Sequence, residues 1–598
     1  MKKLYGIRFP FEKIVGCEDL YLRGKEYFFD SEDECVRICK GGFVGFNTYF
    51  NMFSLEKWEK YTNLDSLYLT IDVVGDFCLM VGTRYLVAGD YLEKRLINRK
   101  YLGIEGKICV NLSDYLHERG LLFFSIQAIS DECYLHGASY LTGEFDSLNL
   151  ATVTCTYKRE EYIHRFVEDF KKFKYENLFS FVIDNGKTLE IDDIENLKVV
   201  KNKNYGGAGG FARGMLEIND YNKNLFDNSK KKIDYVVLMD DDILIDFRMF
   251  EELISFISLL KEEYRNYFIA GGMCSLDFPF LQYEKYASWK GDHFVQSGPS
   301  YDLRDINTII TNEREDRETY RTAGWWFCCF SADIIRMNNY PFPCFFRGDD
   351  MEFSIRNGSN IITLNGINVW HEPFYKKYTI SSESYYLTRN TLIINSLYLK
   401  SMSAKQNIKY VWKKFIRAIL TFDYDSAELL IKAMEDFQKG VSFLENIDPE
   451  EYNQLIMKKN HKKISIDSAI NDYRFDDINY EIYNKTDRGI RCLLRRITFN
   501  GFIFPGFMLR PFGFALEGFG ARYINYYKVK TVFVFDPFTR TGYFLTRNRA
   551  KAMRLLNDFW SEKRKFVKNY RRICDDYSMN FWKLQTETFW RNILEVSV

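Results

Sequence analysis

The chain has 598 residues, of which 46% are hydrophobic, 17% aromatic and 27% charged, so we expect a globular protein of two to four domains. The 82 basic and 82 acidic residues cancel, and no overall charge favours a nucleic acid partner. The 13 cysteines are scattered and form no paired CxxC motif, which argues against a disulfide framework or a zinc site.

Residues 1–10 carry charge but no apolar run of signal-peptide length. No other segment offers the roughly 18 uninterrupted apolar residues of a membrane span. We therefore expect a cytoplasmic protein that does not cross a membrane.

The first part of the chain alternates short β-rich runs with Gly, Asn and Asp turns. Strands at this spacing, without long helical patterns between them, predict an antiparallel β-sandwich over residues 1–148. The runs are Ser66–Val74, Phe77–Gly82, Tyr85–Ala88, Lys107–Val110 and Leu121–Ala128. The aromatic segment 42–53, with Trp58 after it, has two interpretations: it packs in the core, or it lines a sugar-binding groove.

At Ala151 the pattern changes to alternating strands and helices. A strand at 151–156 is followed by a helical pattern over Glu161–Phe173 and by a second strand that ends at Asp184. A third strand leads into the glycine-rich segment 202–215, which enters a helix. This order predicts a nucleotide-binding α/β sheet. The other interpretation of the glycines is a flexible surface loop.

Residues 235–246 join a valine-rich apolar run to three consecutive aspartates. The run predicts a buried parallel strand, and ligands of open α/β sheets bind at the carboxyl ends of such strands. Side chains alternate along a strand, so Asp240 and Asp242 face one way and Asp241 the other. Two carboxylates on one side suit Mg²⁺ or Mn²⁺ held with a diphosphate. The alternative is a solvated acidic turn.

The chain from residue 396 onward reads as mainly helical. Lys405–Leu420 and Ser426–Lys439 have amphipathic periodicity, and 546–594 predicts two basic, aromatic helices. A basic segment, Arg488–Arg496, precedes an aromatic run at Phe499–Phe519 that prolines and glycines interrupt. We expect the region 488–530 either to rest on an anionic membrane surface or to pack on the catalytic domain.

Several motifs carry a resemblance to a known family. They are the Asp triplet, the Gly-Trp-Trp at 324–326, the acid cluster Asp349-Asp350-Met351-Glu352 and the Trp-His pair at 370–371, in that order. The chain resembles the GT-A glycosyltransferases of inverting family 2. Within that family it is similar to the polymerising galactofuranosyltransferases of the mycobacterial cell wall.

This resemblance implies an α/β fold. Its three domains would be an N-terminal antiparallel β-sandwich at 1–148, a GT-A catalytic domain at 149–395 and a mainly helical C-terminal domain at 396–598. It implies metal-dependent transfer of galactofuranose from UDP-galactofuranose to a growing, lipid-linked cell-surface glycan, at the inner face of the membrane. Another donor, such as a rhamnosyl nucleotide, is an alternative, and so is a catalytically silent carbohydrate-binding protein. A homo-oligomer is also compatible with this resemblance.

The resemblance also assigns catalytic roles. Asp240, Asp242 and His371 would bind Mn²⁺ or Mg²⁺, and Asp350 would be the base that accepts the proton of the acceptor hydroxyl. Acceptor binding would fall to Asp349, Trp325 and Trp326. Each has a structural alternative, because aspartates cap helices, tryptophans pack in cores, and an isolated histidine is often structural.

The donor pocket is predicted from the ends of the first strands and from the glycine segment. Its residues would be Thr154, Tyr157, Arg159, Asp184, Asn204, Gly206, Gly207, Arg213 and Asp241. Asp184 would accept from the uracil ring N–H. The chain departs from the family at Lys158, where a small amide residue is common, and at Cys328 and Cys329, which follow the tryptophan pair.

Overall fold

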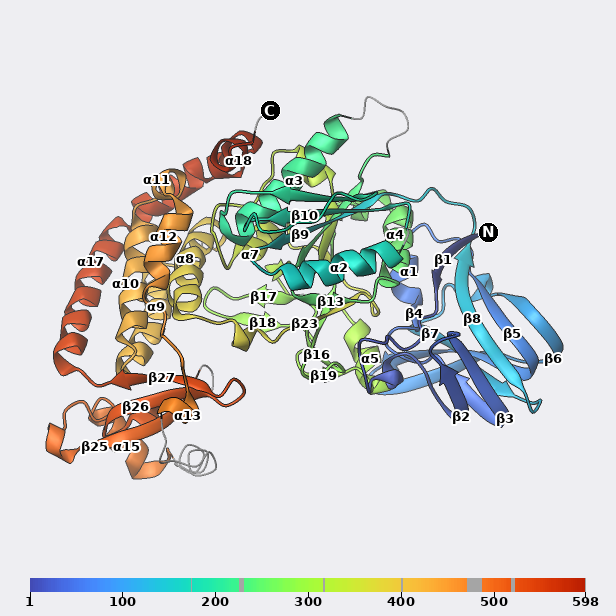
Figure 1. Cartoon of the computed structure of the whole chain (residues 1–598), viewed down its shortest axis with the longest axis horizontal. Helices are drawn as coiled ribbons and strands as arrows, with labels where there is room; N and C mark the ends of the chain where they lie inside the picture. The colour runs from blue at the N-terminus through green and yellow to red at the C-terminus, as the bar shows by residue number, and fades with distance from the viewer. Residues whose placement is uncertain are drawn as a thin grey trace. The chain divides into compact units, whose positions relative to one another are not determined.

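The computed structural model describes residues 1–173, 175–224, 231–315, 318–399, 402–469, 487–517 and 522–596. The chain forms two compact units (Figure 1): Met1–Pro341 with Asp350–Pro373 and Gln585–Val598, and Phe342–Asp349 with Phe374–Leu584. This division differs from the predicted boundary at 395/396, because the chain enters the second unit at 374 and its last residues return to the first. None of the described helices is long and apolar enough to span a membrane.

The N-terminal strands of the first unit form an antiparallel sheet that folds back on itself. Strand β5 pairs with β8 along its first half and with β7 along its second half. Inward side chains alternate along β5, from Leu69 through Val81, and are fully buried. The strands are β1 (Lys2–Gly6), β2 (Arg23–Asp30), β3 (Cys35–Gly45), β4 (Phe53–Ser54), β5 (Tyr68–Val87), β6 (Asp90–Asn111), β7 (Leu121–Ala128) and β8 (Cys133–Thr142). Three of the predicted runs are thus one long strand, which continues through a bulge between Gly75 and Phe77.

The aromatic segment at 42–53 belongs to the core. Phe46, Tyr49, Phe50 and Phe53 are buried, and the Trp58 ring stacks on Phe53. In the structure the core interpretation therefore holds for these rings, and they line no sugar-binding groove.

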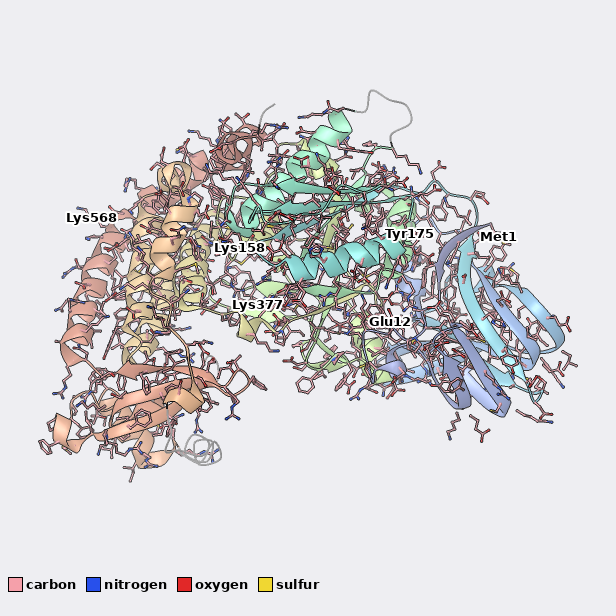
Figure 2. All side chains as sticks on the ribbon, in the orientation of Figure 1. Met1, Glu12, Lys158, Tyr175, Lys377 and Lys568 are labelled. Carbon is pink, nitrogen blue, oxygen red and sulfur yellow. The ribbon has the colours of Figure 1, made fainter. Side chains whose placement is uncertain are left out.

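The α/β part of the first unit is built on a seven-stranded sheet in the order β11-β10-β9-β12-β21-β14-β22. The first four strands are mutually parallel, as predicted, and β21 joins antiparallel to β12. Figure 1 shows α3 on one side of β9 and β10 and α2 on the other, and side chains fill the space between them (Figure 2). The strands are β9 (Leu150–Thr156), β10 (Leu178–Asp184), β11 (Leu197–Lys201), β12 (Tyr235–Asp240), β14 (Phe268–Ala270), β21 (Cys328–Ser331) and β22 (Ile361–Ile362); the helices are α2 (Glu160–Lys172), α3 (Gly206–Lys223) and α4 (Met249–Leu259).

A second, five-stranded sheet lies beyond the end of β12. Its order is β13-β23-β15-β16-β19, with β13 (Ile243–Ile245), β23 (Asn368–His371), β15 (Gly272–Ser275), β16 (Leu281–Glu284) and β19 (Tyr301–Asp302). Only Asp241 and Asp242 separate β12 from β13. The aspartate triplet therefore occupies the point where the chain leaves one sheet and enters the other.

The second unit combines helices with a small sheet that the sequence pattern did not indicate. The predicted helices are present as α9 (Ala404–Leu420), α10 (Tyr424–Gln438) and α17 (Arg549–Asn580), packed with α8 (Leu387–Tyr398). A four-stranded sheet has the order β24-β27-β26-β25. Its strands are β24 (Ile464–Ser465), β25 (Arg510–Leu516) from the aromatic run, β26 (Val529–Asp536) and β27 (Thr541–Thr546). Part of that run is thus an ordered strand.

Candidate metal centre and active site

The aspartate triplet begins on the last residue of a buried strand. Residues 235–239 of β12 are buried, and Asp240 ends the strand between β9 and β21. Asp242 is buried, whereas about a third of the Asp240 side chain is exposed. The buried position of Asp242 excludes the alternative of a solvated acidic turn.

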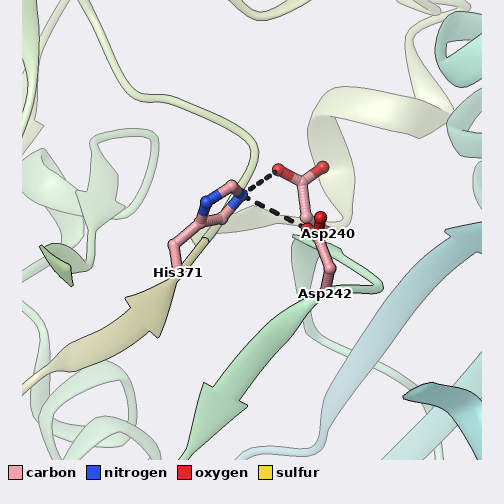
Figure 3. A group of neighbouring side chains, drawn as sticks. All are labelled: Asp240, Asp242 and His371. Carbon is pink, nitrogen blue, oxygen red and sulfur yellow. Dashed lines mark hydrogen bonds and ion pairs between the residues drawn. The ribbon is translucent and has the colours of Figure 1, made fainter. Parts of the chain in front are cut away.

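Strand pairing brings His371 to these carboxylates from 131 residues away. β13 pairs antiparallel with β23, with Ile243 opposite His371, so the imidazole lies beside the residue that precedes Ile243. His371 Nε2 is 3.2 Å from Asp240 Oδ2 and 3.3 Å from Asp242 Oδ1. Figure 3 shows the three side chains pointing toward one another. The structure thus brings together the three predicted metal ligands.

The hydrogen bonding of His371 prepares Nε2 to bind a metal. Its Nδ1 is bonded to the backbone carbonyl oxygen of Glu372, and because a carbonyl only accepts, Nδ1 carries the proton. In the neutral ring, Nε2 then presents its lone pair to the carboxylates. One ligand atom from each residue lies within 4.8 Å of the others. Two carboxylate oxygens and an imidazole nitrogen repel one another unless a cation lies between them, and this donor set fits Mn²⁺ or Mg²⁺.

Asp241 is not one of the three converging side chains, and its carboxylate binds the end of β9 and the segment that follows it. Its carboxylate accepts from Thr156 Oγ1 at 2.8 Å and from Arg159 Nη1 at 2.9 Å. Arg159 also reaches Asp242 Oδ2 at 3.0 Å. Burial raises the pKa of Asp241, while Arg159 and Thr156 oppose that shift. Arg159 is therefore held at the edge of the metal site.

Thr156 is a site residue that the sequence analysis missed. It shares a face of β9 with the predicted Thr154, but it lies at the end of the strand and binds Asp241. Thr154 lies inside the sheet between Val182 and Met239, and its buried Oγ1 has no hydrogen-bond partner among the described residues. Strand alternation was the available signal, because it places every second residue on the same face.

The other two predicted donor-binding residues at the strand ends differ in exposure: Tyr157 is exposed and Asp184 is buried. The ammonium of Lys158 lies 5.3 Å from the centre of the Tyr157 ring. Lys158 has a φ of 55°, a left-handed conformation that asparagine adopts more readily than lysine. Asp184 is buried, and its two carboxylate oxygens accept from the backbone N–H of Gly186 and Leu189. Asp184 therefore holds its own loop, and its contact with uracil stays a prediction.

The glycine-rich segment is the first part of helix α3, which excludes the alternative of a flexible loop. Gly206 starts the helix with a φ of 68°, and its N–H is bound by Asn204 Oδ1 at 3.1 Å; Gly207 follows in the same turn. A Cβ on Gly210 would lie 2.0 Å from Cys155 Sγ, and one on Gly214 would lie 2.1 Å from Val153 Cγ1. These last two glycines let α3 approach β9, which is a packing role.

Gly214→Ala is expected to lower the free energy of unfolding of the first unit by roughly 1 to 3 kcal/mol, because the added methyl collides with a buried valine. Chemical denaturation would measure the change. Gly143→Ala is the matched control, since its new Cβ would have no neighbour closer than 3.7 Å. Equal stability of the two variants would show that the close contact between α3 and β9 relaxes without cost.

Arg213 lies further along α3 and is engaged by another side chain. Its Nε donates to Glu217 Oε1 at 2.8 Å, one helical turn on, and Lys198 binds the other oxygen of that carboxylate. The predicted phosphate contact would require Arg213 to leave this pair.

Trp325 and Trp326 are both buried. The Trp325 ring packs edge-on against Phe211 at 4.9 Å, and Trp326 Nε1 donates to the Gly271 carbonyl at 2.9 Å. The Trp326 ring covers Gly324, where a Cβ would lie 1.9 Å from it. The prediction of open stacking faces for the acceptor is therefore corrected: in this structure the pair belongs to the core.

The acid cluster begins helix α7 (Asp349–Arg356). Asp350 and Asp349 are partly exposed, and Asp350 Oδ1 accepts from the Met351 N–H at 2.7 Å. Glu352 is fully buried and binds Arg356 Nε at 2.8 Å and Gln585 Nε2 at 3.0 Å. Glu352 therefore has a structural role, and the two aspartates are the cluster's candidates for proton transfer.

Burial raises the pKa of the Cys328 thiol, and the nearby charge of Asp350 raises it further. Cys328 lies on β21 opposite Leu238 of β12, so β21 is the strand next to the one that ends at Asp240.

Comparison with known proteins finds curated relatives of the chain that are glycosyltransferases. They are the galactofuranosyltransferases GlfT2 of Mycolicibacterium smegmatis, 22% identical over 449 residues, and of Mycobacterium tuberculosis, 22% identical over 459 residues. Each match covers 68% of this chain, and they cover 66% and 67% of the relatives. The predicted resemblance to the mycobacterial galactofuranosyltransferases is confirmed.

No family model matches the chain. Solved structures that resemble it include Staphylococcus aureus TarS, with 13% identity, a TM-score of 0.29 and 52% of each chain covered. Another is the mannosyltransferase PcManGT of Pyrobaculum calidifontis in complex with GDP-Man and Mn²⁺, with 12% identity, a TM-score of 0.24 and coverage of 45% of this chain and 67% of that one. Likenesses this weak do not bear on fold or activity.

Proposed function

We propose that the chain is a metal-dependent, inverting glycosyltransferase of GT-A type. It would transfer galactofuranose from UDP-galactofuranose to a growing, lipid-linked cell-surface glycan. The observation that carries the proposal is the convergence of Asp240, Asp242 and His371 at the end of β12. Similarity to galactofuranosyltransferases over 68% of the chain supports the donor.

In the proposed reaction the acceptor hydroxyl oxygen bonds to the anomeric carbon while the bond from that carbon to the diphosphate oxygen breaks. Attack from the face opposite the leaving group inverts the anomeric centre. Asp350 accepts the proton of the acceptor hydroxyl while the hydroxyl oxygen bonds to the anomeric carbon. UDP leaves with the electron pair of the broken bond. A bound divalent cation would offset the charge that develops on the diphosphate.

Two charged groups beside the metal ligands suit the donor. Arg159 sits between Asp241 and Asp242 and is about two-fifths exposed, so its guanidinium has donors left for a phosphate oxygen. The exposed ring of Tyr157 lies two residues earlier and would pack against the uridine. Asn204 and the first turn of α3 complete the proposed pocket.

Two competing functions remain testable against this proposal. A different donor, such as a rhamnosyl nucleotide, would use the same metal ligands and base. A catalytically silent carbohydrate-binding protein would not need Asp240, Asp242 and His371 to converge at the end of a buried strand. The structure therefore favours catalysis.

The deciding experiment measures release of the nucleoside diphosphate from UDP-galactofuranose, UDP-galactose and a rhamnosyl nucleotide, each with and without a synthetic lipid-linked galactan acceptor and Mn²⁺. We expect UDP-galactofuranose to be the one donor of the three that reacts, and its UDP to be released only when the acceptor is present. Release from the rhamnosyl nucleotide would move the assignment to the other donor. Glycan binding without release from any donor would identify the silent binding protein.

A further inference from the structure

Helix α15 (Gly489–Ile497) of the second unit turns its aliphatic residues outward. Ile490, Leu493, Leu494 and Ile497 follow the spacing of one helical face and are 77%, 56%, 48% and 61% exposed. A surface helix normally turns such a face toward the core. In α15 that face is left without cover from the described residues.

The inward residue of α15 is an arginine. Arg495 is only 7% exposed, and it forms a two-pronged pair with Asp487, with Nη2 at 2.7 Å from Oδ2 and Nε at 3.0 Å from Oδ1. Its guanidinium also lies 5.3 Å from the ring of Tyr523. This pair holds Arg495 on the inner side of the helix, so the aliphatic residues on the opposite side face outward.

The turn after α15 continues the surface and is anchored to the unit. Asn500 Nδ2 donates to the Leu420 carbonyl at 2.8 Å, and Arg547 Nη2 donates to the Gly501 carbonyl at 3.0 Å. From this anchored turn, large apolar side chains again point outward. We define the α15 surface by its exposed apolar residues, Ile490, Leu493, Leu494, Ile497, Phe499, Ile503, Phe507 and Met508, together with the exposed Arg488, Arg491 and Arg496.

The charge of the α15 surface is of one sign. On the helix, Arg491 and Arg496 flank the aliphatic face on opposite sides. The sequence has no Asp or Glu from Arg488 to Leu516. Of the two acids that border the segment, Asp487 is paired with Arg495 and Glu517 with Lys463. An aliphatic face between arginines matches the boundary of an anionic bilayer, where acyl chains lie beneath phosphate groups.

We propose that the α15 surface docks the protein on an anionic lipid bilayer. Charge complementarity favours this partner over a second copy of the chain, because a two-fold interface would place the arginines of both copies face to face. The site lies in the second unit and makes no use of the metal ligands. Its test therefore does not depend on the proposed transfer reaction.

The experiment is co-sedimentation of the full chain with vesicles of phosphatidylcholine alone or mixed with phosphatidylglycerol, at low and high salt. We expect binding to the anionic vesicles and release at high salt. Leu493→Ser with Phe507→Ser is expected to weaken binding by about tenfold or more through lost apolar burial. Arg491→Gln and Arg496→Gln are each expected to weaken it by roughly fivefold. Circular dichroism would verify that each variant is folded.

Met553→Ser is the matched control, because Met553 is an exposed apolar residue of α17 outside the α15 surface. It is expected to bind like the parent protein. Equal binding to neutral and anionic vesicles, or full binding by Leu493→Ser with Phe507→Ser, would overturn the proposal. Self-association that this double variant abolishes, with no vesicle binding, would assign the surface to an interface between copies.

Discussion

Alanine in place of Asp242 or His371 is expected to reduce metal-dependent turnover by roughly a thousandfold, because each change removes a ligand from the ion that offsets the diphosphate charge. Both side chains are almost fully buried and lie within 3.3 Å of each other. Neighbouring ligands therefore have little freedom to replace the lost one. The measurement is UDP release as a function of Mn²⁺ concentration, with Mn²⁺ affinity determined separately by calorimetry.

The controls for this prediction are an acid and a histidine elsewhere in the first unit. Asp131→Ala and His117→Ala remove exposed side chains, each in an ion pair on the surface, and surface pairs contribute little to stability. Both are expected to keep full activity and full Mn²⁺ dependence. If Asp242→Ala and His371→Ala also keep them while folded, the metal centre is not where we place it.

Asparagine in place of Asp350 is expected to lower turnover by roughly a hundredfold or more with donor affinity nearly unchanged. Asparagine keeps the shape and still accepts the hydrogen bond from the Met351 N–H, but it cannot take the acceptor proton. If Asp350 only caps α7, asparagine would replace it well, because the two residues cap helices about equally. The change therefore separates proton transfer from helix capping.

Asp349→Asn is the neighbouring control for the base, with kcat, acceptor KM and donor affinity measured for both variants. We expect it to raise acceptor KM more than it lowers kcat. An inactive Asp349→Asn beside an active Asp350→Asn would move the base by one residue. Full rates in both would place the base outside the cluster, since the buried carboxylate of Glu352 is bound to Arg356 and Gln585.

Local patterns identified the parts of the α/β sheet well. Short apolar runs with polar ends predicted β9, β10, β11 and β12 as parallel strands. The prediction was possible because the length and burial of a strand are visible in the pattern of consecutive apolar residues. They did not show that several N-terminal runs form one long strand, because a bulge reads in sequence as a turn. Nor did they show the small sheet of the second unit, because its strand β25 lies in an aromatic run that prolines and glycines interrupt.

The sequence by itself determined the aspartate triplet at a strand end, the alternation that separates Asp241 from its neighbours, and the resemblance to galactofuranosyltransferases. Only the tertiary structure decided which distant residues meet these groups. The register of β13 on β23 brings His371 to the carboxylates. Helix α3 packs so closely on β9 that Gly210 and Gly214 have no room for a side chain. It also buried both tryptophans and turned the α15 aliphatic face outward. Burial depends on what packs over a residue, and that is set by contacts far along the chain.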